Sequence, residues 1–324
     1  MLAQYSISDF FESFQYQYMQ RSLISTLIVG IVCGLIGVFI ILRGLSFLGA
    51  GIAHSCFAGG ALAILLGISP FITIFLFGEI SALTIGYVNE KQEADKKDTA
   101  VGIMFSFTMA LAVLFVGLYD KYSTNVQSLL FGNALTISQE NLIQLIITAS
   151  IVIILFFLIK KELLFVTFDE EMAKVTGIPV RFLNYAFLMM VAAVITVSLK
   201  AIGAILVFAM IVTPAAAAYQ WTYNTNYMLV LSASFGAISS FLGLLLSFIF
   251  DMPTGSSIVI VVTVIFFISF VVSPKRRKMY AFTMAHDQES HRKECAYCRE
   301  LNGENKCPYC QEEEKMAEKE AGSK

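Results

Sequence analysis

Charged side chains are scarce in this chain. Asp, Glu, Lys and Arg together make up 14% of its 324 residues, whereas hydrophobic residues make up 57%, and the mean hydropathy is +0.74. A soluble protein with so little charge could not cover its surface with polar groups. The net charge of −2 averages a very hydrophobic body with a charged tail, so it indicates no partner, and we expect none among nucleic acids.

Motifs that would indicate an enzyme are also missing. The chain has no Walker A phosphate-binding pattern, so it cannot use ATP alone. It lacks HExxH, GxSxG and paired-carboxylate motifs, which leaves a membrane-embedded enzyme built on His54 and Glu79 without support. We also expect no cleavable signal peptide, because the first twenty residues are polar and aromatic rather than basic and then apolar.

What the chain has instead is a series of long apolar runs. About 20 apolar residues in a helix span a bilayer, and these runs are too long and too continuous for barrel strands. They predict an all-α, polytopic membrane bundle of about eight or nine helices. The predicted spans lie near residues 22–42, 47–66, 70–88, 99–119, 142–160, 182–200, 202–220, 228–250 and 255–273.

Basic residues orient the predicted bundle, because cytoplasmic loops collect Lys and Arg. One set of alternate loops holds most of them: Arg43, Lys91, Lys96, Lys97, Lys160, Lys161, Lys174, Arg181, Lys275, Arg276, Arg277 and Lys278. The opposite set holds only Arg21, Lys121 and Lys200. We therefore expect a multi-pass protein of the plasma membrane with its N-terminus outside and its C-terminus in the cytoplasm.

Three regions follow from this layout. Residues 1–20 are rich in Phe and Tyr and predict an interfacial segment at the outer surface; the alternative is a slightly longer first span. Residues 21–274 form the transmembrane domain. Residues 275–324 form a cytoplasmic tail, and its basic start at 275–278 is suited to anionic lipid headgroups.

Within the apolar body, His54 is the first candidate for function. It lies in the second predicted span, in the segment Gly49 to Ser55, and ionisable groups at membrane depth are costly and usually functional. The structural alternative is a histidine that only hydrogen-bonds a neighbouring backbone or hydroxyl group. Cys33 and Cys56 are soft ligands in principle, but burial as small hydrophobic side chains is the simpler interpretation.

A short cytoplasmic helix is predicted between the fifth and sixth spans. Asp169 is a good N-cap, and Glu170 suits the positive end of the helix dipole. Gly177 is a natural residue just past a helix end, and Pro179 prevents continuation. Such a helix can dock a soluble partner, although on its own it could be a mere connector.

From Arg21 to Pro274 the chain resembles the membrane permease subunits of ABC importers for divalent metals, the zinc, manganese and iron uptake systems. The resemblance rests on several stretches in family order: Leu35–Phe39 with Leu42-Arg43, Gly49–Ser55 with Phe57–Gly59, Asp98–Ile103, Leu130–Asn133, Gly203–Val207 with Thr213–Ala216, and Asp251–Gly255. Each stretch is weak alone, and their common order makes the match specific.

The resemblance implies a division of labour. Two permease copies, or this chain with a close relative, would form the pore, and the homodimer is our expectation. A separate cytoplasmic ATPase would supply ATP hydrolysis, and an extracytoplasmic binding protein would deliver the metal. The helix between spans would insert into the ATPase, which makes its matching residues the coupling set: Asp169, Glu170, Ala173 and Gly177.

The same resemblance exposes a departure at the metal site. Relatives usually carry an aspartate four residues before the histidine, where both side chains share one helix face and can hold an ion together. Here that position is Ala50. Glu79, at a similar depth on the next span, is the candidate substitute, so His54 and Glu79 are predicted to share a transient site. The alternative for Glu79 is a protonated side chain buried in packing.

The tail carries a separate signal, the pattern CxxC-x8-CxxC over residues 295–310. Two such pairs joined by a hairpin can coordinate zinc tetrahedrally, and Asn302-Gly303 suits the turn. In the cytoplasm a disulfide is the less favoured alternative. We therefore predict Zn(II) bound by Cys295, Cys298, Cys307 and Cys310, as a structural clip, a docking module or a sensor.

The sequence leaves the cargo open among zinc, manganese and iron. Loss of the carboxylate favours a softer ion, since imidazole suits zinc and carboxylate suits manganese. A second hypothesis is a permease of the same type that moves a metal chelate or another small solute. The alanine at position 50 favours this hypothesis, and the retained His54 argues against it.

Overall fold

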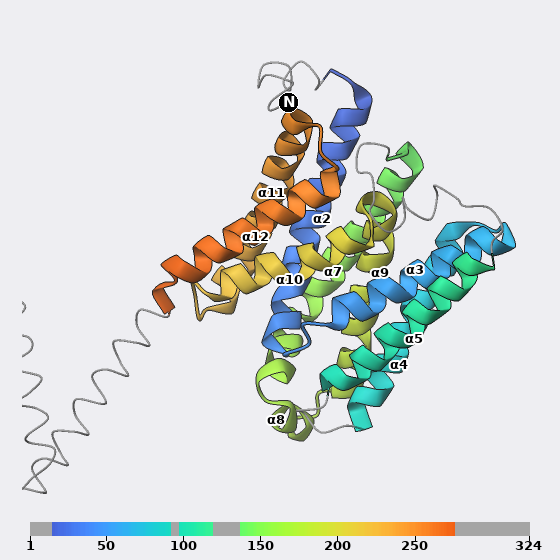
Figure 1. Ribbon diagram of the computed structural model, residues 1–324. Helices are drawn as coiled ribbons and strands as arrows, with labels where there is room; N and C mark the ends of the chain where they lie inside the picture. The colour runs from blue at the N-terminus through green and yellow to red at the C-terminus, as the bar shows by residue number, and fades with distance from the viewer. Residues whose placement is uncertain (1–14, 92–96, 119–136, 276–324) are drawn as a thin grey trace, which may run out of the picture. The chain divides into compact units, whose positions relative to one another are not determined.

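The computed structural model describes residues 15–91, 97–118 and 137–275. The chain divides into two units, residues 1–271 and 272–324, and every contact discussed below lies within the first. All regular elements in the described ranges are helices (Figure 1): α2 (Gln17–Leu42), α3 (Leu48–Leu66), α4 (Pro70–Lys91), α5 (Lys97–Gly117), α7 (Gln139–Phe168), α8 (Glu170–Val175), α9 (Val180–Ile202), α10 (Ala204–Tyr219), α11 (Thr225–Phe250) and α12 (Thr254–Val272).

Each of the nine predicted spans coincides with one helix. Eight of these helices are long and apolar enough to cross a membrane, and α10, at 16 residues, is the short one. At a rise of 1.5 Å per residue α10 extends about 24 Å, less than the thickness of a bilayer core. It begins immediately after Gly203, whose positive φ of 89° interrupts the helical conformation between α9 and α10.

The first helix begins earlier than the sequence indicated. α2 starts at Gln17 rather than near residue 22, so it includes the end of the predicted interfacial segment. The exposed rings of Tyr16 and Tyr18 stack at this end, 5.8 Å apart. Residues 1–14 lie outside the described residues, as do 276–324 with the four tail cysteines.

α2 packs along α11, and their close contact is made by small residues. A Cβ added at Gly30 would stand only 2.6 Å from the carbonyl oxygen of Gly236, which shows how near the two backbones lie. Ser232 donates a hydrogen bond to the carbonyl oxygen of Gly34 at 2.7 Å, and Ser240 donates to that of Thr26 at 2.8 Å. Small and hydroxyl residues hold membrane helices together in this way.

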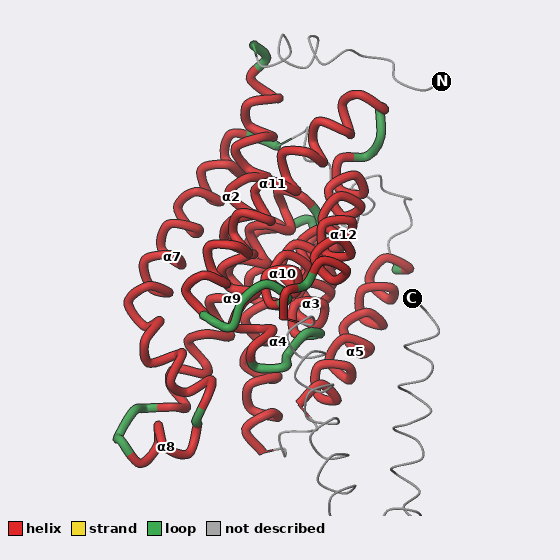
Figure 2. The backbone as a smooth tube through the Cα atoms, turned by 90° about the vertical axis from the view of Figure 1, so that its left-hand side faces the viewer, coloured by secondary structure: helices red, strands yellow, loops and turns green. Residues whose placement is uncertain are grey.

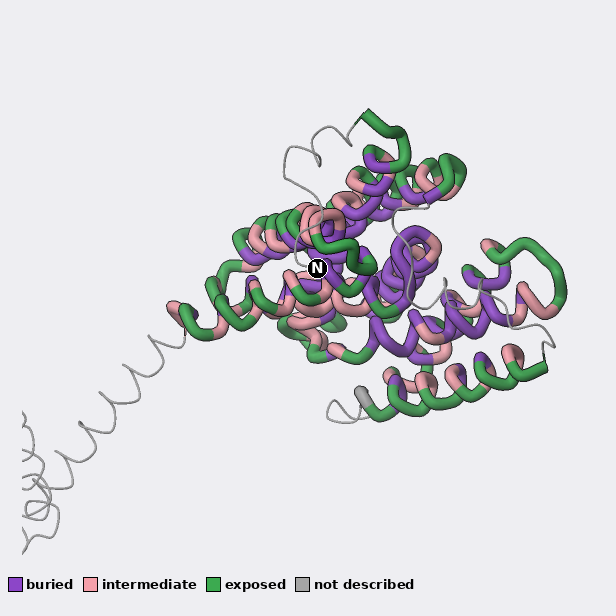
Figure 3. The backbone as a smooth tube through the Cα atoms, turned by 45° about the horizontal axis from the view of Figure 1, so that its top comes forward, coloured by how far each residue is buried: buried purple, intermediate pink, exposed green. Residues whose placement is uncertain are grey.

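A second group consists of α3 with α4 and α5, which lie side by side in Figure 1. Gly59 of α3 lies against the backbone of Thr73 in α4, and Gly51 lies against Val101 in α5. These contacts enclose α3, so that buried residues gather in the middle of the bundle and exposed ones at its periphery (Figure 3). The helix that carries His54 is thus an interior element.

Polar contacts sort the helix ends into two groups. At one end Arg43 bonds to the end of α7, and Lys160 of α7 bonds to Asn226 at the start of α11. At the other end Arg21 bonds to Gln139. Arg43 and Lys160, which the sequence grouped together, therefore lie toward the same end of the bundle, the end where α8 also lies (Figure 2).

Candidate functional site

His54 lies in the middle of α3, half-buried, with its ring facing α5. The imidazole meets the ring of Phe105 edge-on, with 4.6 Å between ring centroids. Its Nδ1 atom is buried and has no hydrogen-bond partner among the described residues. A structural histidine would normally use that nitrogen, so the hydrogen-bonded alternative weighed for His54 is not supported at this atom.

The imidazole borders an open cavity of about 700 Å³. This volume is within the range of small-molecule binding sites. The walls come from three places in the fold: Phe47, Ala50 and His54 at the start and middle of α3; Thr99, Val101, Gly102, Phe105 and Ser106 on α5; and Phe208 on α10. The lining is mainly apolar. The hydroxyl of Ser106 already donates to the carbonyl oxygen of Gly102 at 3.0 Å.

Ala50 lines the same cavity as His54, one helical turn earlier. The predicted sharing of a helix face therefore holds, and the side chain that would complete a carboxylate–imidazole pair is a methyl group. No group of three or more His, Cys, Asp or Glu side chains that could hold a metal occurs within the described parts of the chain. One copy of the permease thus offers a single imidazole here rather than a closed coordination site.

Glu79 is not among the residues that line this cavity. The neighbouring Gly78 faces Cys56 of α3 and Thr196 of α9, whose side chains are 3.4 Å apart. Glu79 lies within electrostatic reach of Cys56. Two residues apart on a helix, His54 and Cys56 project about 200° from each other. The structure does not bring His54 and Glu79 into one cavity, and their shared site stays a prediction that requires a rearrangement.

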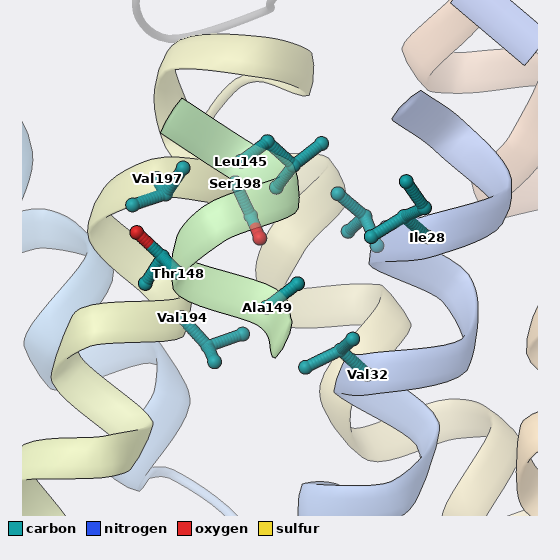
Figure 4. Close-up of a pocket in the computed structure, with 9 residues that line it drawn as sticks. Ile28, Val32, Leu145, Thr148, Ala149, Val194, Val197 and Ser198 are labelled. Atoms are coloured by element: carbon teal, nitrogen blue, oxygen red, sulfur yellow. The ribbon is translucent and has the colours of Figure 1, made fainter. Parts of the chain in front are cut away.

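The other buried groups fit a packing role. Cys33 and Cys56 are both buried and free, as expected for small hydrophobic side chains. A second cavity, of about 10 Å³, lies between α2, α7 and α9 (Figure 4). Its lining is aliphatic apart from Thr148 and Ser198, and it has room for about one water molecule. It is a packing defect and offers no ligand set.

α8 has the capped ends that the sequence predicted. A side-chain oxygen of Asp169 accepts a hydrogen bond from the backbone N–H of Met172 at 2.8 Å, the N-cap interaction. Glu170 pairs with Lys174 at 2.9 Å. Gly177 has a φ of 82°, and the N–H of Ile178 reaches back to a carbonyl oxygen inside α8 at 3.1 Å. These bonds form a Schellman C-cap, so six residues suffice for a defined helix.

α8 has one buried face and one exposed apolar face. Ala173 is completely buried against Val166, Val180 and Leu183 at the ends of α7 and α9. Met172 and Val175 point outward, and Val175 is 82% exposed. Among the four residues predicted for coupling, Asp169, Glu170 and Gly177 stabilise α8 itself. Ala173 packs α8 against α7 and α9.

Comparison with known proteins places this arrangement in a family. The profile of the ABC 3 transport family matches residues 15–273, which is most of the chain. The chain belongs to this family. The match confirms the resemblance to permease subunits of ABC importers and, with the apolar helices, shows a multi-pass membrane protein.

The chain covers almost the whole length of individual relatives. It is 44% identical over 268 residues to the manganese transport system membrane protein MntC of Listeria monocytogenes, covering 82% of this chain and 95% of the relative. It is 34% identical to the chelated iron transport system membrane protein YfeD of Yersinia pestis, covering 86% and 95%. Among solved structures, PsaBC from Streptococcus pneumoniae in complex with Fab matches with a TM-score of 0.76 and 36% identity, covering 85% of this chain and 99% of that chain.

The structure also identifies residues that the sequence did not single out. Phe105 and Ser106 line the cavity beside His54, and the only signal for them was their nearness to the Asp98–Ile103 stretch. Arg43 was named from the sequence only as a basic loop residue and as part of the Leu42-Arg43 match. The structure adds that it bonds to both α7 and α9.

Proposed function

We propose that the permease carries a divalent transition-metal ion across the membrane, and that the ion passes through the cavity that His54 lines. The observation that carries this proposal is the imidazole of His54 lining an open cavity inside a membrane bundle. Neutral imidazole binds divalent transition metals. The family match supports the cargo class, because MntC is named for manganese and YfeD for chelated iron.

One imidazole is a weak site, and a transport pathway benefits from weak binding because the ion must also leave. Glu79 remains our proposed second ligand, reached only after a movement of α3 against α4. A second permease copy, packed with the first as a homodimer, would bring a second His54 to the pathway. The missing carboxylate at Ala50 favours zinc or ferrous iron over manganese.

A chelate is the second candidate cargo. The size of the cavity favours it, because a volume of about 700 Å³ is larger than a bare ion fills. An uptake assay distinguishes the two cargoes, in proteoliposomes that hold the permease with its ATPase and binding protein. We expect ATP-dependent uptake of free Zn²⁺, Fe²⁺ or Mn²⁺. Uptake of iron only as a preformed complex, with no uptake of any free ion, would assign the chelate instead.

ATP hydrolysis resides on a partner chain, and α8 is our proposed docking element for that cytoplasmic ATPase. Its exposed Met172 and Val175 support this role, since apolar side chains anchor protein interfaces. The end of the bundle that holds α8 also holds Arg43, Lys174 and Arg181, which supports its assignment as the cytoplasmic end. The N-terminus then lies outside, on the side where an extracytoplasmic metal-binding protein would dock.

The variant Val175→Asp tests the docking role of α8. An aspartate at this exposed position leaves the fold of the permease intact but places a charge in the interface. We expect the affinity for the ATPase to fall by about 30-fold. Copurification of the ATPase with the permease measures this effect, and Val175→Leu is the matched control that keeps an apolar anchor. Equal recovery of the ATPase with all three permeases would remove Val175 from the interface.

The tail is proposed to bind zinc through Cys295, Cys298, Cys307 and Cys310. The support is the spacing of the two CxxC pairs, because the tail lies outside the described residues. Permease purified without added metal is expected to contain about one zinc ion per chain by elemental analysis. Replacing Cys295 and Cys298 with serine should remove it, and replacing Cys33 with serine should not. A zinc content near zero in the unaltered, reduced permease would contradict the assignment.

A further inference from the structure

Arg43 makes an unusual set of contacts at the end of α2. Its Nε donates a hydrogen bond to the hydroxyl of Thr167 at 3.0 Å, and its Nη1 donates to the side-chain oxygen of Asn184 at 2.9 Å. The guanidinium also stands 4.9 Å from the centre of the Phe187 ring. A planar guanidinium holds these donors in one rigid fork while it contacts the ring, whereas an ammonium group is a compact charge without a fixed fork.

The two hydrogen-bond partners lie on either side of α8. Thr167 precedes the N-cap residue Asp169 by two positions, at the end of α7. Asn184 lies in the second turn of α9, which follows α8 after a short turn. A single side chain thus bonds to the segments immediately before and after the coupling helix. Glu170 in the first turn of α8 is also within electrostatic reach of Arg43.

The guanidinium is largely enclosed but remains charged. Burial lowers the pKa of Arg43 to about 10, and the nearby Glu170 opposes this effect, so the side chain stays protonated at neutral pH. Its Nη2 atom is buried without a hydrogen-bond partner among the described residues. Beneath it, Phe39 of α2 packs against Phe156 of α7 at 5.3 Å and Phe187 of α9 at 6.3 Å. The same three helices are therefore joined twice, by Arg43 and by these rings.

The backbone leads from Arg43 to the cavity by a short and rigid route. Gly44 has a φ of 68°, and the N–H of Leu45 bonds to the carbonyl oxygen of Ile40 at 3.0 Å. This C-cap fixes the corner between α2 and α3, and the side chain of Leu45 is buried. Two residues later Phe47 forms part of the cavity wall beside His54.

From these contacts we infer that Arg43 is a positioning residue that transmits movement of α8 to the corner between α2 and α3, and so to the wall of the His54 cavity. The inference rests on the proposed docking of the ATPase on α8. A movement of α8 displaces Thr167 and Asn184, and Arg43 carries that displacement because it bonds to both. The cavity then widens or narrows in step with the ATPase.

Arg43→Lys tests this inference, since lysine keeps the charge and loses the two-armed hydrogen bonding. In proteoliposomes with ATPase and binding protein, we expect ATP-driven uptake of Zn²⁺, Fe²⁺ or Mn²⁺ to fall about tenfold. ATP hydrolysis by the same assembled complex should stay within about twofold of the unaltered permease. The number of ions moved per ATP therefore drops, an uncoupling that loss of folding would not produce.

Two further variants and a control sharpen the result. Thr167→Val removes the contact before α8 and Asn184→Ala the contact after it, and each should lower the ratio of uptake to hydrolysis by part of the effect of Arg43→Lys. Lys160→Met is the control, because it removes an interhelical hydrogen bond of 2.7 Å from α7 without touching the flanks of α8. Its ratio should equal that of the unaltered permease.

Two outcomes would overturn the inference. One is an unchanged ratio of uptake to hydrolysis in Arg43→Lys. The other is a parallel loss of uptake, hydrolysis and ATPase copurification, which would make Arg43 a structural residue only. Absence of ion uptake by the unaltered permease is a distinct result, since it contradicts the proposed cargo and not the role of Arg43.

Discussion

Replacing His54 with alanine is expected to reduce ATP-driven ion uptake by at least about 100-fold, with little effect on folding. The imidazole is the only titratable or metal-binding side chain among the residues that line the cavity, and its Nδ1 is unpartnered among the described residues. Removing a neighbour that merely supports a metal ligand already costs about 10- to 100-fold. Uptake of radioactive zinc, iron or manganese into proteoliposomes measures the loss.

The companion variants come from the neighbouring helices α5 and α4. Ser106→Ala alters the cavity wall without removing a strong ligand and should keep most of the uptake. Glu79→Gln, assayed beside it, decides whether Glu79 acts as the second ligand: a loss of about tenfold supports it, and full activity removes it. Uptake by His54→Ala at the level of the unaltered permease would make the histidine structural.

The second large effect concerns the contact between α2 and α11. Gly236→Ala places a methyl group against the backbone of Gly30, so the two helices must separate along a contact that also includes the Ser232 and Ser240 hydrogen bonds. We expect the free energy of unfolding to fall by about 2 kcal/mol or more, because backbone atoms cannot move aside as a flexible side chain can. Equilibrium unfolding in detergent measures the change.

Gly102→Ala is the matched control for this prediction. Gly102 is also a glycine inside a membrane helix, but a Cβ added there meets no heavy atom within 4 Å. Its replacement should leave the permease as stable or up to about 1 kcal/mol more stable, since alanine favours helix. Equal destabilisation by the two variants would show that the approach of α2 and α11 is not tight.

The sequence predicted the helices well because their signal is local. Each span is a continuous apolar run, and the short α8 carries its own N-cap at Asp169 and its own C-terminal glycine at Gly177. The start of α2 was placed too late, since Gln17, Gln20 and Arg21 are polar residues that a span does not require. The sequence placed the boundary between the sixth and seventh spans near residue 201, and the structure puts it at Gly203, where φ is 89°.

The site was only partly predictable, because it depends on how helices rotate against one another. Spacing alone put Ala50 and His54 on one face, and both line the cavity. Depth alone suggested that Glu79 faces His54, yet Glu79 is absent from that lining and its neighbour Gly78 faces the Cys56 side of α3. The partners of Arg43 are 124 and 141 residues away, and no local pattern connects them.

Contact between the transported ion and His54 is the central claim, and Mn²⁺ provides the most direct measurement because it is paramagnetic. Pulsed electron paramagnetic resonance of Mn²⁺ bound to the permease–ATPase complex detects the nitrogen nuclei of ligating imidazole. The chain has three histidines, and the comparison with His54→Ala isolates the one in the cavity. We predict a nitrogen coupling in the unaltered complex that disappears in His54→Ala. Bound Mn²⁺ with no nitrogen coupling, or with one that the variant leaves unchanged, would contradict the proposed pathway.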